Sequence, residues 1–189
     1  MTTALVCYAD GSEDIEVTAI TDILNRGGVK VVKAAVAESG RTTVTLAHGS
    51  VITTDKNIAD CTDNYDLIAI PGGLAGSEAC RDCEILINKL KSQKNAGRYI
   101  GAICAAPGFV LSTHGLIGNA RATGYPGCKT DTIINYCTDG VVTDSDARLV
   151  TGQGPAYALD FALALLEALE GKDVADRVAA GMLHSCAAK

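Results

Sequence analysis

One cysteine stands where a predicted strand turns into a predicted helix. The apolar run Tyr99–Ile103 predicts a short buried strand, Ala105–His114 is compatible with a helix, and Cys104 lies between them. Alanines at positions −2, +1 and +2 leave the sulfur uncrowded. A tight strand-to-helix turn holds a nucleophile above a sheet, and a helix N-terminus favours the thiolate. The spacing fits a reactive thiolate and, equally well, a buried structural cysteine.

Two other loops are expected at the same edge of the sheet. Thr3–Tyr8 predicts a buried strand, and the helix that follows it carries Glu16 in its first turn. Asp66–Ile70 predicts another buried strand, which ends in a Pro-Gly-Gly turn containing Gly72 and Gly73. Glycine amides at the carboxyl end of a strand can face an anion. Alone, the turn and the carboxylate would be unremarkable surface features, but three such loops together indicate a site.

Strands and helices alternate along the rest of the chain. Further strands are predicted at Val29–Val36, Gly118–Thr123, Val141–Thr143 and Leu149–Thr151, with a hairpin formed by Thr42–Leu46 and Ser50–Thr54. Helices are predicted from an N-cap at Ser12 to Gly27, and at Asp82–Lys91, Ala156–Leu169 and Asp173–Leu183. Ile15 and Ile85 are expected to face inward. This order predicts an α/β three-layer sandwich with a mainly parallel central sheet, in a single domain over residues 1–189.

Composition limits the classes of function. The chain has 189 residues, of which 48% are hydrophobic, enough for one domain with a substantial core. Its net charge of −6 and its lack of a basic cluster argue against a nucleic-acid-binding surface. No apolar stretch reaches membrane-spanning length, and the first residues lack the charged region of a signal peptide. We therefore expect a soluble cytoplasmic enzyme that does not bind membranes.

The cysteines and histidines do not predict a metal site. The chain has eight cysteines but is too long and too rich in predicted helices and strands for a secreted disulfide scaffold, so reduced thiols are expected. The only close pair, Cys80 and Cys83, lacks a second C-x-x-C, and the three histidines are scattered. The last four residues, 186–189, have C-a-a-X spacing, but a terminal lysine argues against prenylation.

Several segments together resemble the ThiJ/PfpI superfamily, in particular the branch that contains Parkinson disease protein seven. These segments are A-L-V-C-Y-A-D-G-S-E-D-I-E, D-L-I-A-I-P-G-G, I-G-A-I-C-A-A-P, G-Q-G-P-A and F-A-L-A-L-L-E-A-L-E-G-K. They span nearly the whole chain, and A-I-C-A-x-P after a strand is quite specific. The resemblance implies a flavodoxin-like fold, also found in class I glutamine amidotransferases. It implies a homodimer with the first helix at the interface, which the segment Val17–Ile20 permits, and it implies no cofactor.

The resemblance also implies roles for the marked residues. Cys104 would be the reactive thiolate, and Glu16 would be a protonated carboxyl that hydrogen-bonds its sulfur, a role that needs partial burial. The amides of Gly72, Gly73 and Ala105 would form an anion or oxyanion pocket. The same contacts would stabilise a sulfinate after oxidation.

Three departures from the superfamily narrow the activity. Tyr125 stands where some relatives have a histidine, Ala105 stands where the peptidase branch has one, and the region around Pro155 lacks the His-Pro-Glu of amidotransferases. His114 cannot replace them, because a helical rise of about 1.5 Å per residue places it more than roughly 10 Å from the sulfur. Proteolysis and amidotransfer therefore lose support, and Tyr125 and Pro155 are assigned to a possible substrate pocket.

Two functions remain open. In the first, Cys104 adds to the aldehyde of methylglyoxal or glyoxal, Glu16 moves a proton between adjacent carbons, and hydrolysis releases lactate or glycolate. Such a glyoxalase III-type hydro-lyase would use the same chemistry as a deglycase-type hydrolase on early glycation adducts of proteins. In the second, the protein is an oxidative-stress sensor or redox-regulated chaperone that signals through a Cys104 sulfinate.

Overall fold

A seven-stranded sheet forms the middle layer of the computed structural model, which describes residues 1–184. Its spatial order is β10-β11-β7-β6-β1-β2-β5. The strands are β1 Thr3–Tyr8, β2 Lys30–Ala35, β5 Lys56–Asn57, β6 Leu67–Ile70, β7 Tyr99–Ile103, β10 Val141–Asp144 and β11 Leu149–Gly152. Every neighbouring pair is parallel except β10 with β11. The predicted mainly parallel sheet is confirmed.

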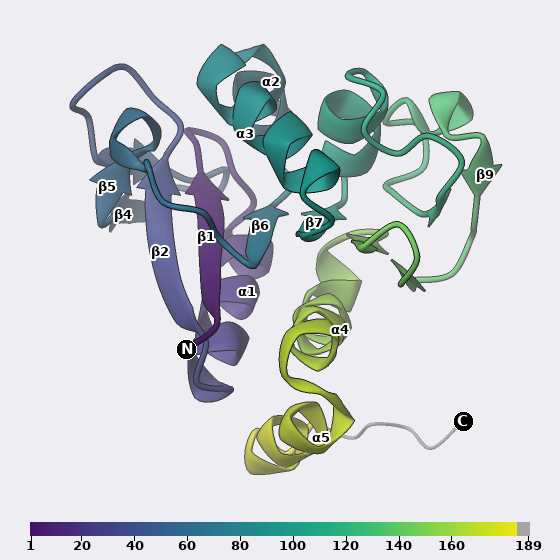
Figure 1. The fold of residues 1–189 in the computed structure, drawn as a ribbon. Helices are drawn as coiled ribbons and strands as arrows, with labels where there is room; N and C mark the ends of the chain where they lie inside the picture. The colour runs from purple at the N-terminus through teal and green to yellow at the C-terminus, as the bar shows by residue number, and fades with distance from the viewer. Residues whose placement is uncertain (185–189) are drawn as a thin grey trace.

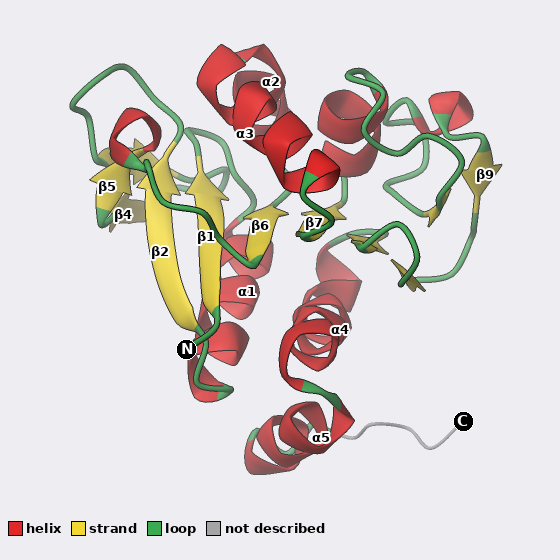
Figure 2. Cartoon of the chain, viewed as in Figure 1, coloured by secondary structure: helices red, strands yellow, loops and turns green. Residues whose placement is uncertain are grey.

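Helices cover both faces of the sheet (Figures 1 and 2). One face carries α1 Asp14–Arg26 and α4 Ala158–Glu170, with α5 Lys172–Gly181 packed on α4. The other face carries α2 Leu74–Asp82, α3 Glu84–Asn95 and a short π-helix, Pro107–Ser112. These layers form the predicted sandwich, which is the flavodoxin-like fold.

Two hydrophobic cores lie between the layers, and strand β1 shows why. Ala4, Val6 and Tyr8 point into the core beneath α1 and α4. Leu5 and Cys7 point into the core beneath α2 and α3. Because alternate side chains of a strand face opposite sides of a sheet, a continuous apolar run serves both cores at once.

Smaller elements surround the sheet. A hairpin of β3 Thr43–Thr45 and β4 Val51–Thr53 confirms the predicted one, and a parallel pair joins β8 Arg121–Ala122 to β9 Asn135–Tyr136. Three short 3₁₀ turns lie at Ile58–Asp60, Thr130–Thr132 and Pro155–Tyr157. Of the strand predicted at Gly118–Thr123, only Arg121–Ala122 forms a strand, because the preceding residues form turns.

The helices differ from expectation in three places. Helix α2 was not predicted, and α3 begins at Glu84 instead of Asp82. The predicted helix after Cys104 is a π-helix, in which Thr113 N–H donates to the carbonyl five residues earlier. Ile15 and Ile85 are 58% and 46% exposed, so neither faces inward as expected. Each lies in the first turn of its helix, on the outward side, and the residue that follows it, Glu16 or Leu86, is the one that is buried.

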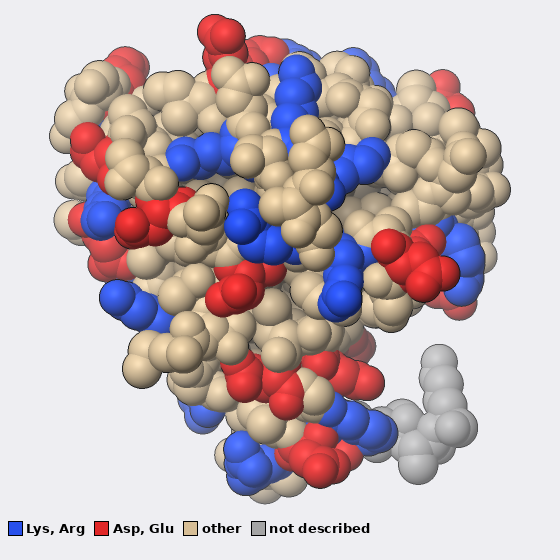
Figure 3. Space-filling view, in the orientation of Figure 1, with Lys and Arg blue, Asp and Glu red and all other residues tan. Residues whose placement is uncertain are grey.

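The surface mixes charges of both signs. On the face in Figure 3, Lys and Arg side chains that are scattered in sequence gather near the middle, with acidic side chains around them. Within residues 1–184, no helix is both long and apolar enough to cross a bilayer. The C-a-a-X segment lies outside the described residues, as do residues 185–189 of the predicted domain.

Candidate active site

Cys104 occupies a sharp turn directly after β7. Its φ is +63°, a left-handed conformation that non-glycine residues rarely adopt. Its N–H donates to Gly152 O at 2.9 Å, and its carbonyl accepts from Tyr125 N–H at 2.7 Å. Hydrogen bonds from both neighbouring segments thus hold the strained residue, as expected for a nucleophile elbow.

Glu16 is the third residue of α1 and is fully buried. Its Oε2 accepts a hydrogen bond from Gly72 N–H at 2.6 Å. Its Oε1 is buried without a conventional hydrogen-bond partner within residues 1–184. A carboxyl at this helical position often folds back to cap its own helix. Here it reaches across to the loop after β6 instead, toward the cysteine.

Glu13, not Ser12, caps α1. The Glu13 carboxylate accepts the Glu16 N–H at 2.7 Å, whereas Ser12 Oγ accepts Ala9 N–H at 3.0 Å within the preceding turn. The cap lies one residue later than predicted because the Ser12 hydroxyl is used by the strand end. Glu13 is also the site residue that the sequence analysis missed. Its spacing of three residues before Glu16 was the available signal.

Gly72 allows the carboxyl and the thiol to meet. A Cβ atom at Gly72 would overlap Cys104 Cβ, and it would lie 2.6 Å from Glu16 Oε2 and 2.9 Å from Cys104 Sγ. Since these three groups surround one point, no side chain fits there. The structure therefore brings Glu16, the loop after β6 and Cys104 together at one edge of the sheet.

Two backbone amides face the sulfur. The N–H groups of Gly73 and Ala105 interact with Cys104 Sγ in a way that favours its anionic form. These are two of the three amides expected to form an anion pocket. The Gly72 amide is not available for it, because it donates to Glu16. Of the three amides predicted for an anion pocket, those of Gly73 and Ala105 therefore remain candidates.

Burial controls the protonation of Glu16. Desolvation is the main reason that its pKa rises from 4.5 to about 7, and the charge of Glu13 adds to the rise. The Gly72 amide and the Cys104 thiol act in the opposite direction. A carboxyl with this pKa is partly protonated at neutral pH, in line with the neutral acid that the resemblance implies.

The Cys104 thiol departs from expectation. Its pKa rises to about 12, first because the sulfur is partly buried and second because the Glu16 carboxylate lies beside it. The amides of Gly73 and Ala105 oppose this rise without overcoming it. A helix N-terminus by itself was expected to lower the pKa of this thiol. That expectation did not include the Glu16 carboxylate. Carboxyl and thiol thus form a coupled pair that carries at most one negative charge at neutral pH.

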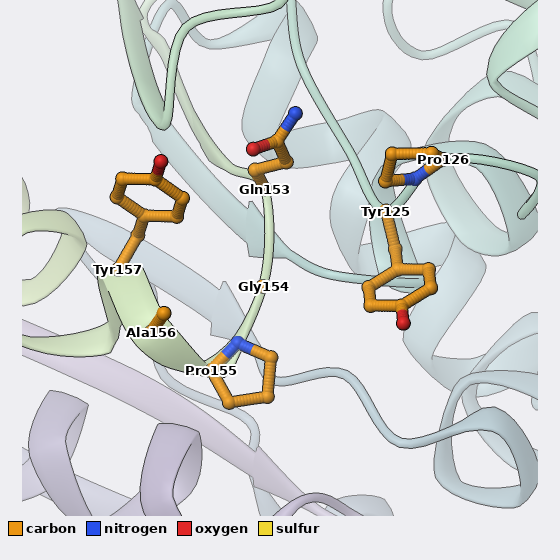
Figure 4. A pocket seen from close by; sticks show the side chains of 7 residues that line it. All are labelled: Tyr125, Pro126, Gln153, Gly154, Pro155, Ala156 and Tyr157. Atoms are coloured by element: carbon orange, nitrogen blue, oxygen red, sulfur yellow. The ribbon is translucent and has the colours of Figure 1, made fainter.

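A pocket of about 440 Å³ lies between the segments at Tyr125 and at Gly154 (Figure 4). Its lining comprises Tyr125, Pro126, Gln153, Gly154, Pro155, Ala156 and Tyr157. Tyr125 and Pro155, which the sequence analysis assigned to a possible pocket, therefore lie on the same cavity. The hydrogen bond from Tyr125 N–H to Cys104 O connects its wall directly to the elbow.

Two of the three histidines have partners away from the site, and the third, His48, lies near Glu13. His114 Nε2 lies 2.9 Å from Arg81 O, His48 Nε2 lies 3.9 Å from Glu13 Oε1, and His184 Nε2 lies 2.9 Å from Asp160 Oδ1. His114 thus points to α2, in agreement with its predicted exclusion from the site. In the described part of the chain, His, Cys, Asp and Glu side chains form no group suited to a metal ion.

Known proteins resemble this chain both in sequence and in fold. The model of the DJ-1/PfpI family matches residues 2–168. "Protein DJ-1 homolog A" of Arabidopsis thaliana is 38% identical over 96% of this chain, which spans only 46% of that protein. "Glutathione-independent glyoxalase DJR-1.2" of Caenorhabditis elegans is 36% identical, with 87% of this chain and 86% of that protein covered. The solved structure "Toxoplasma gondii DJ-1, oxidized" superposes with a TM-score of 0.93 at 39% identity, covering 98% of this chain and all of that one.

Proposed function

Since this chain belongs to the DJ-1/PfpI family, we propose that it is a cysteine-dependent glyoxalase that acts on methylglyoxal and glyoxal without a cofactor. The observation that carries the proposal is the buried contact between the carboxyl of Glu16 and the thiol of Cys104 across Gly72. A relative that is 36% identical is named a glutathione-independent glyoxalase, which supports the same chemistry here.

Glu16 activates the nucleophile in this proposal. The ionised carboxylate takes the thiol proton as Cys104 Sγ bonds to the aldehyde carbon, so a free thiolate need not accumulate. Glu16 then passes this proton to the carbonyl oxygen, which becomes the hydroxyl of a hemithioacetal, and the carboxyl is ionised again. The amides of Gly73 and Ala105 stabilise negative charge next to the sulfur while the bond forms.

The same carboxyl then moves a proton within the bound substrate. Glu16 removes the proton from the former aldehyde carbon and delivers it to the neighbouring carbonyl carbon. The hydroxyl proton passes to the oxygen of that carbonyl, so that the hemithioacetal becomes a thioester of lactate. Water cleaves the thioester, releasing lactate and restoring the thiol. The net reaction adds one water to methylglyoxal. Early adducts of methylglyoxal on protein thiols and amines carry the same two carbons, which extends the proposal to deglycation.

Turnover by the purified protein tests the proposal. Protein incubated with methylglyoxal, without glutathione, is expected to form many equivalents of lactate per chain. Cys104→Ala is expected to abolish product formation. Cys83→Ala removes another partly buried thiol outside the site and serves as the matched control with retained activity. Consumption of one equivalent or less by the wild-type protein contradicts the proposal.

A redox sensor is the second candidate, supported by the two amides that face the sulfur. Two molecules of hydrogen peroxide would oxidise the thiol to a sulfinic acid and release two molecules of water. The sulfinate oxygens would accept hydrogen bonds from Gly73 and Ala105, and a protonated Glu16 would donate a further one. An intact mass that increases by two oxygen atoms after mild peroxide treatment, together with the absence of turnover, would favour this candidate over the glyoxalase.

A further inference from the structure

The pocket beside the elbow has two aromatic walls. In Figure 4, Tyr157 lies on one side of the cavity and Tyr125 with Pro126 on the other, while the main chain at Gly154 runs between them. The two tyrosines are 48% and 38% exposed, for Tyr125 and Tyr157 respectively, so each ring offers open surface. We call this cavity the tyrosine pocket.

Glycines leave room for both rings. The ring of Tyr157 packs over Gly140, where a Cβ atom would overlap the ring carbons. A Cβ atom at Gly154 would lie 3.3 Å from Tyr125 Cδ2, closer than most carbon contacts. The ring positions therefore depend on the absence of these two side chains. A pocket with fixed aromatic walls can select a ligand by shape.

Both walls start at the backbone of Cys104. On one side, the cysteine carbonyl accepts the Tyr125 N–H at 2.7 Å. On the other, its N–H donates to Gly152 O at 2.9 Å, and the chain continues from there through Gln153 and Gly154 into the pocket lining. Both walls of the tyrosine pocket are therefore held by the backbone of the residue that carries the sulfur.

We propose that the tyrosine pocket binds an aromatic substituent on the α-oxoaldehyde, so that the enzyme prefers arylglyoxals to methylglyoxal. This inference rests on the proposed glyoxalase function. Its main support is size, because a cavity of about 440 Å³ falls within the range of pockets that hold ligands much larger than a three-carbon dicarbonyl. A methyl group would leave most of this volume to water, whereas a phenyl ring would displace that water and pack against the tyrosines.

Competing substrates give the first test. The wild-type protein is expected to show a higher kcat/KM for phenylglyoxal than for methylglyoxal. Tyr157→Ala is expected to lower the ratio of these two values roughly three- to tenfold, because an aromatic contact is lost only for the aryl substrate. Tyr157→Phe, which keeps the ring, is expected to restore the ratio. Ile134→Ala truncates an exposed apolar side chain outside the pocket and is the control that leaves the ratio unchanged.

Binding of an unreactive probe separates this inference from the proposed function. 4-Fluoroacetophenone carries the aryl group without an aldehyde, and its ¹⁹F signal is expected to broaden on adding protein and to sharpen with Tyr157→Ala. Binding without turnover of either dicarbonyl would support the pocket and overturn the glyoxalase. Turnover without aryl preference and without probe binding would overturn the pocket alone. If Tyr157→Phe lowers the ratio of the two kcat/KM values as much as Tyr157→Ala does, the pocket proposal is also overturned, since the ring face would then not be the binding element.

Discussion

At the residue scale, the chemistry of this protein depends on a carboxyl that folding places in an unfavourable environment. Glu16 lies in the first turn of α1. Most acidic side chains at this position remain in water and interact favourably with the helix dipole. The burial of Glu16 instead raises its pKa to about 7 and places it beside a thiol whose pKa is also raised. The carboxyl can therefore accept or donate a proton near neutral pH, whereas the thiol keeps its proton until it attacks a substrate.

The raised pKa of Glu16 predicts that stability falls as pH rises. The folded protein retains the proton up to about pH 7, whereas the unfolded chain releases it near 4.5, so the folded state binds more protons in this interval. Glu16→Gln removes the titration. We expect the free energy of unfolding of the variant to increase relative to wild type by about 2 to 3 kcal/mol between pH 5 and pH 8.

Urea unfolding at several pH values measures this difference. Glu84→Gln changes an exposed carboxyl in the first turn of α3 and is the matched control, with a difference that stays constant over the interval. If Glu16→Gln and Glu84→Gln behave alike, the Glu16 carboxyl is not desolvated in solution.

At the element scale, the order of strands explains why three distant loops meet. Strands β7, β6 and β1 are neighbours in the sheet and run parallel, so their carboxyl ends lie side by side. The elbow follows β7, the Pro-Gly-Gly turn follows β6, and the turn into α1 follows β1. Residues 16, 72 and 104 therefore become neighbours because the strands that precede them pair side by side in the sheet.

Adding one methyl group at Gly72, where these loops meet, is expected to have a large effect on activity. Gly72→Ala would place a Cβ atom against Cys104 and 2.6 Å from Glu16 Oε2, which forces the pair apart. Because a displacement of about 1 Å can lower a rate roughly 100-fold, we expect kcat/KM for methylglyoxal to fall by about that factor.

Gly181→Ala is the control for this substitution. Gly181 lies in α5 with open space around its Cβ position, so activity is expected to remain and the helix to be slightly stabilised. Circular dichroism and steady-state rates of both variants complete the comparison. Full activity in a folded Gly72→Ala variant would show that the carboxyl and the thiol need not be adjacent.

Elements with a strong local signal could be predicted from the sequence, and those decided by distant contacts could not. Strands β1, β6 and β7 are uninterrupted apolar runs, so their positions followed directly. Helix α2 follows Gly73 and buries only the small residues Gly76, Ser77 and Cys80, so no pattern of large apolar side chains marked it. Cys104 and Glu16 were identified from turn geometry and resemblance. The raised pKa of the thiol was missed because it arises first from burial and second from a carboxylate 88 positions away in sequence.

At the scale of the whole molecule, α1 and α4 pack against each other and leave apolar side chains in water. Ile15 is 58% exposed and Leu159 is 40% exposed. Within Val17–Ile20, the segment predicted to permit an interface, Val17 and Ile20 are fully buried and only Thr18 is exposed. We propose that the expected homodimer forms through the helical layer of α1, with Ile15 at the contact.

Sedimentation equilibrium tests this assembly. The wild-type protein is expected at about twice its chain mass of 19.4 kDa, and Ile15→Glu is expected to shift the population to single chains because it buries a charge at the interface. Ile134→Glu alters a side chain that is 72% exposed in another region and should leave the mass unchanged. A wild-type protein that sediments as a single chain at micromolar concentration would contradict the proposed dimer.

The two outer strands of the sheet also affect how the protein behaves when crowded. At one margin β5 contributes only two residues, and at the other β10 reverses direction and ends at Asp144, whose carboxylate already accepts the N–H groups of Arg121 and Ala147. Neither margin offers a long row of free amides and carbonyls onto which an incoming chain could add as an extra strand. A polypeptide that is nearly half hydrophobic is thereby protected from fibril growth in its native state.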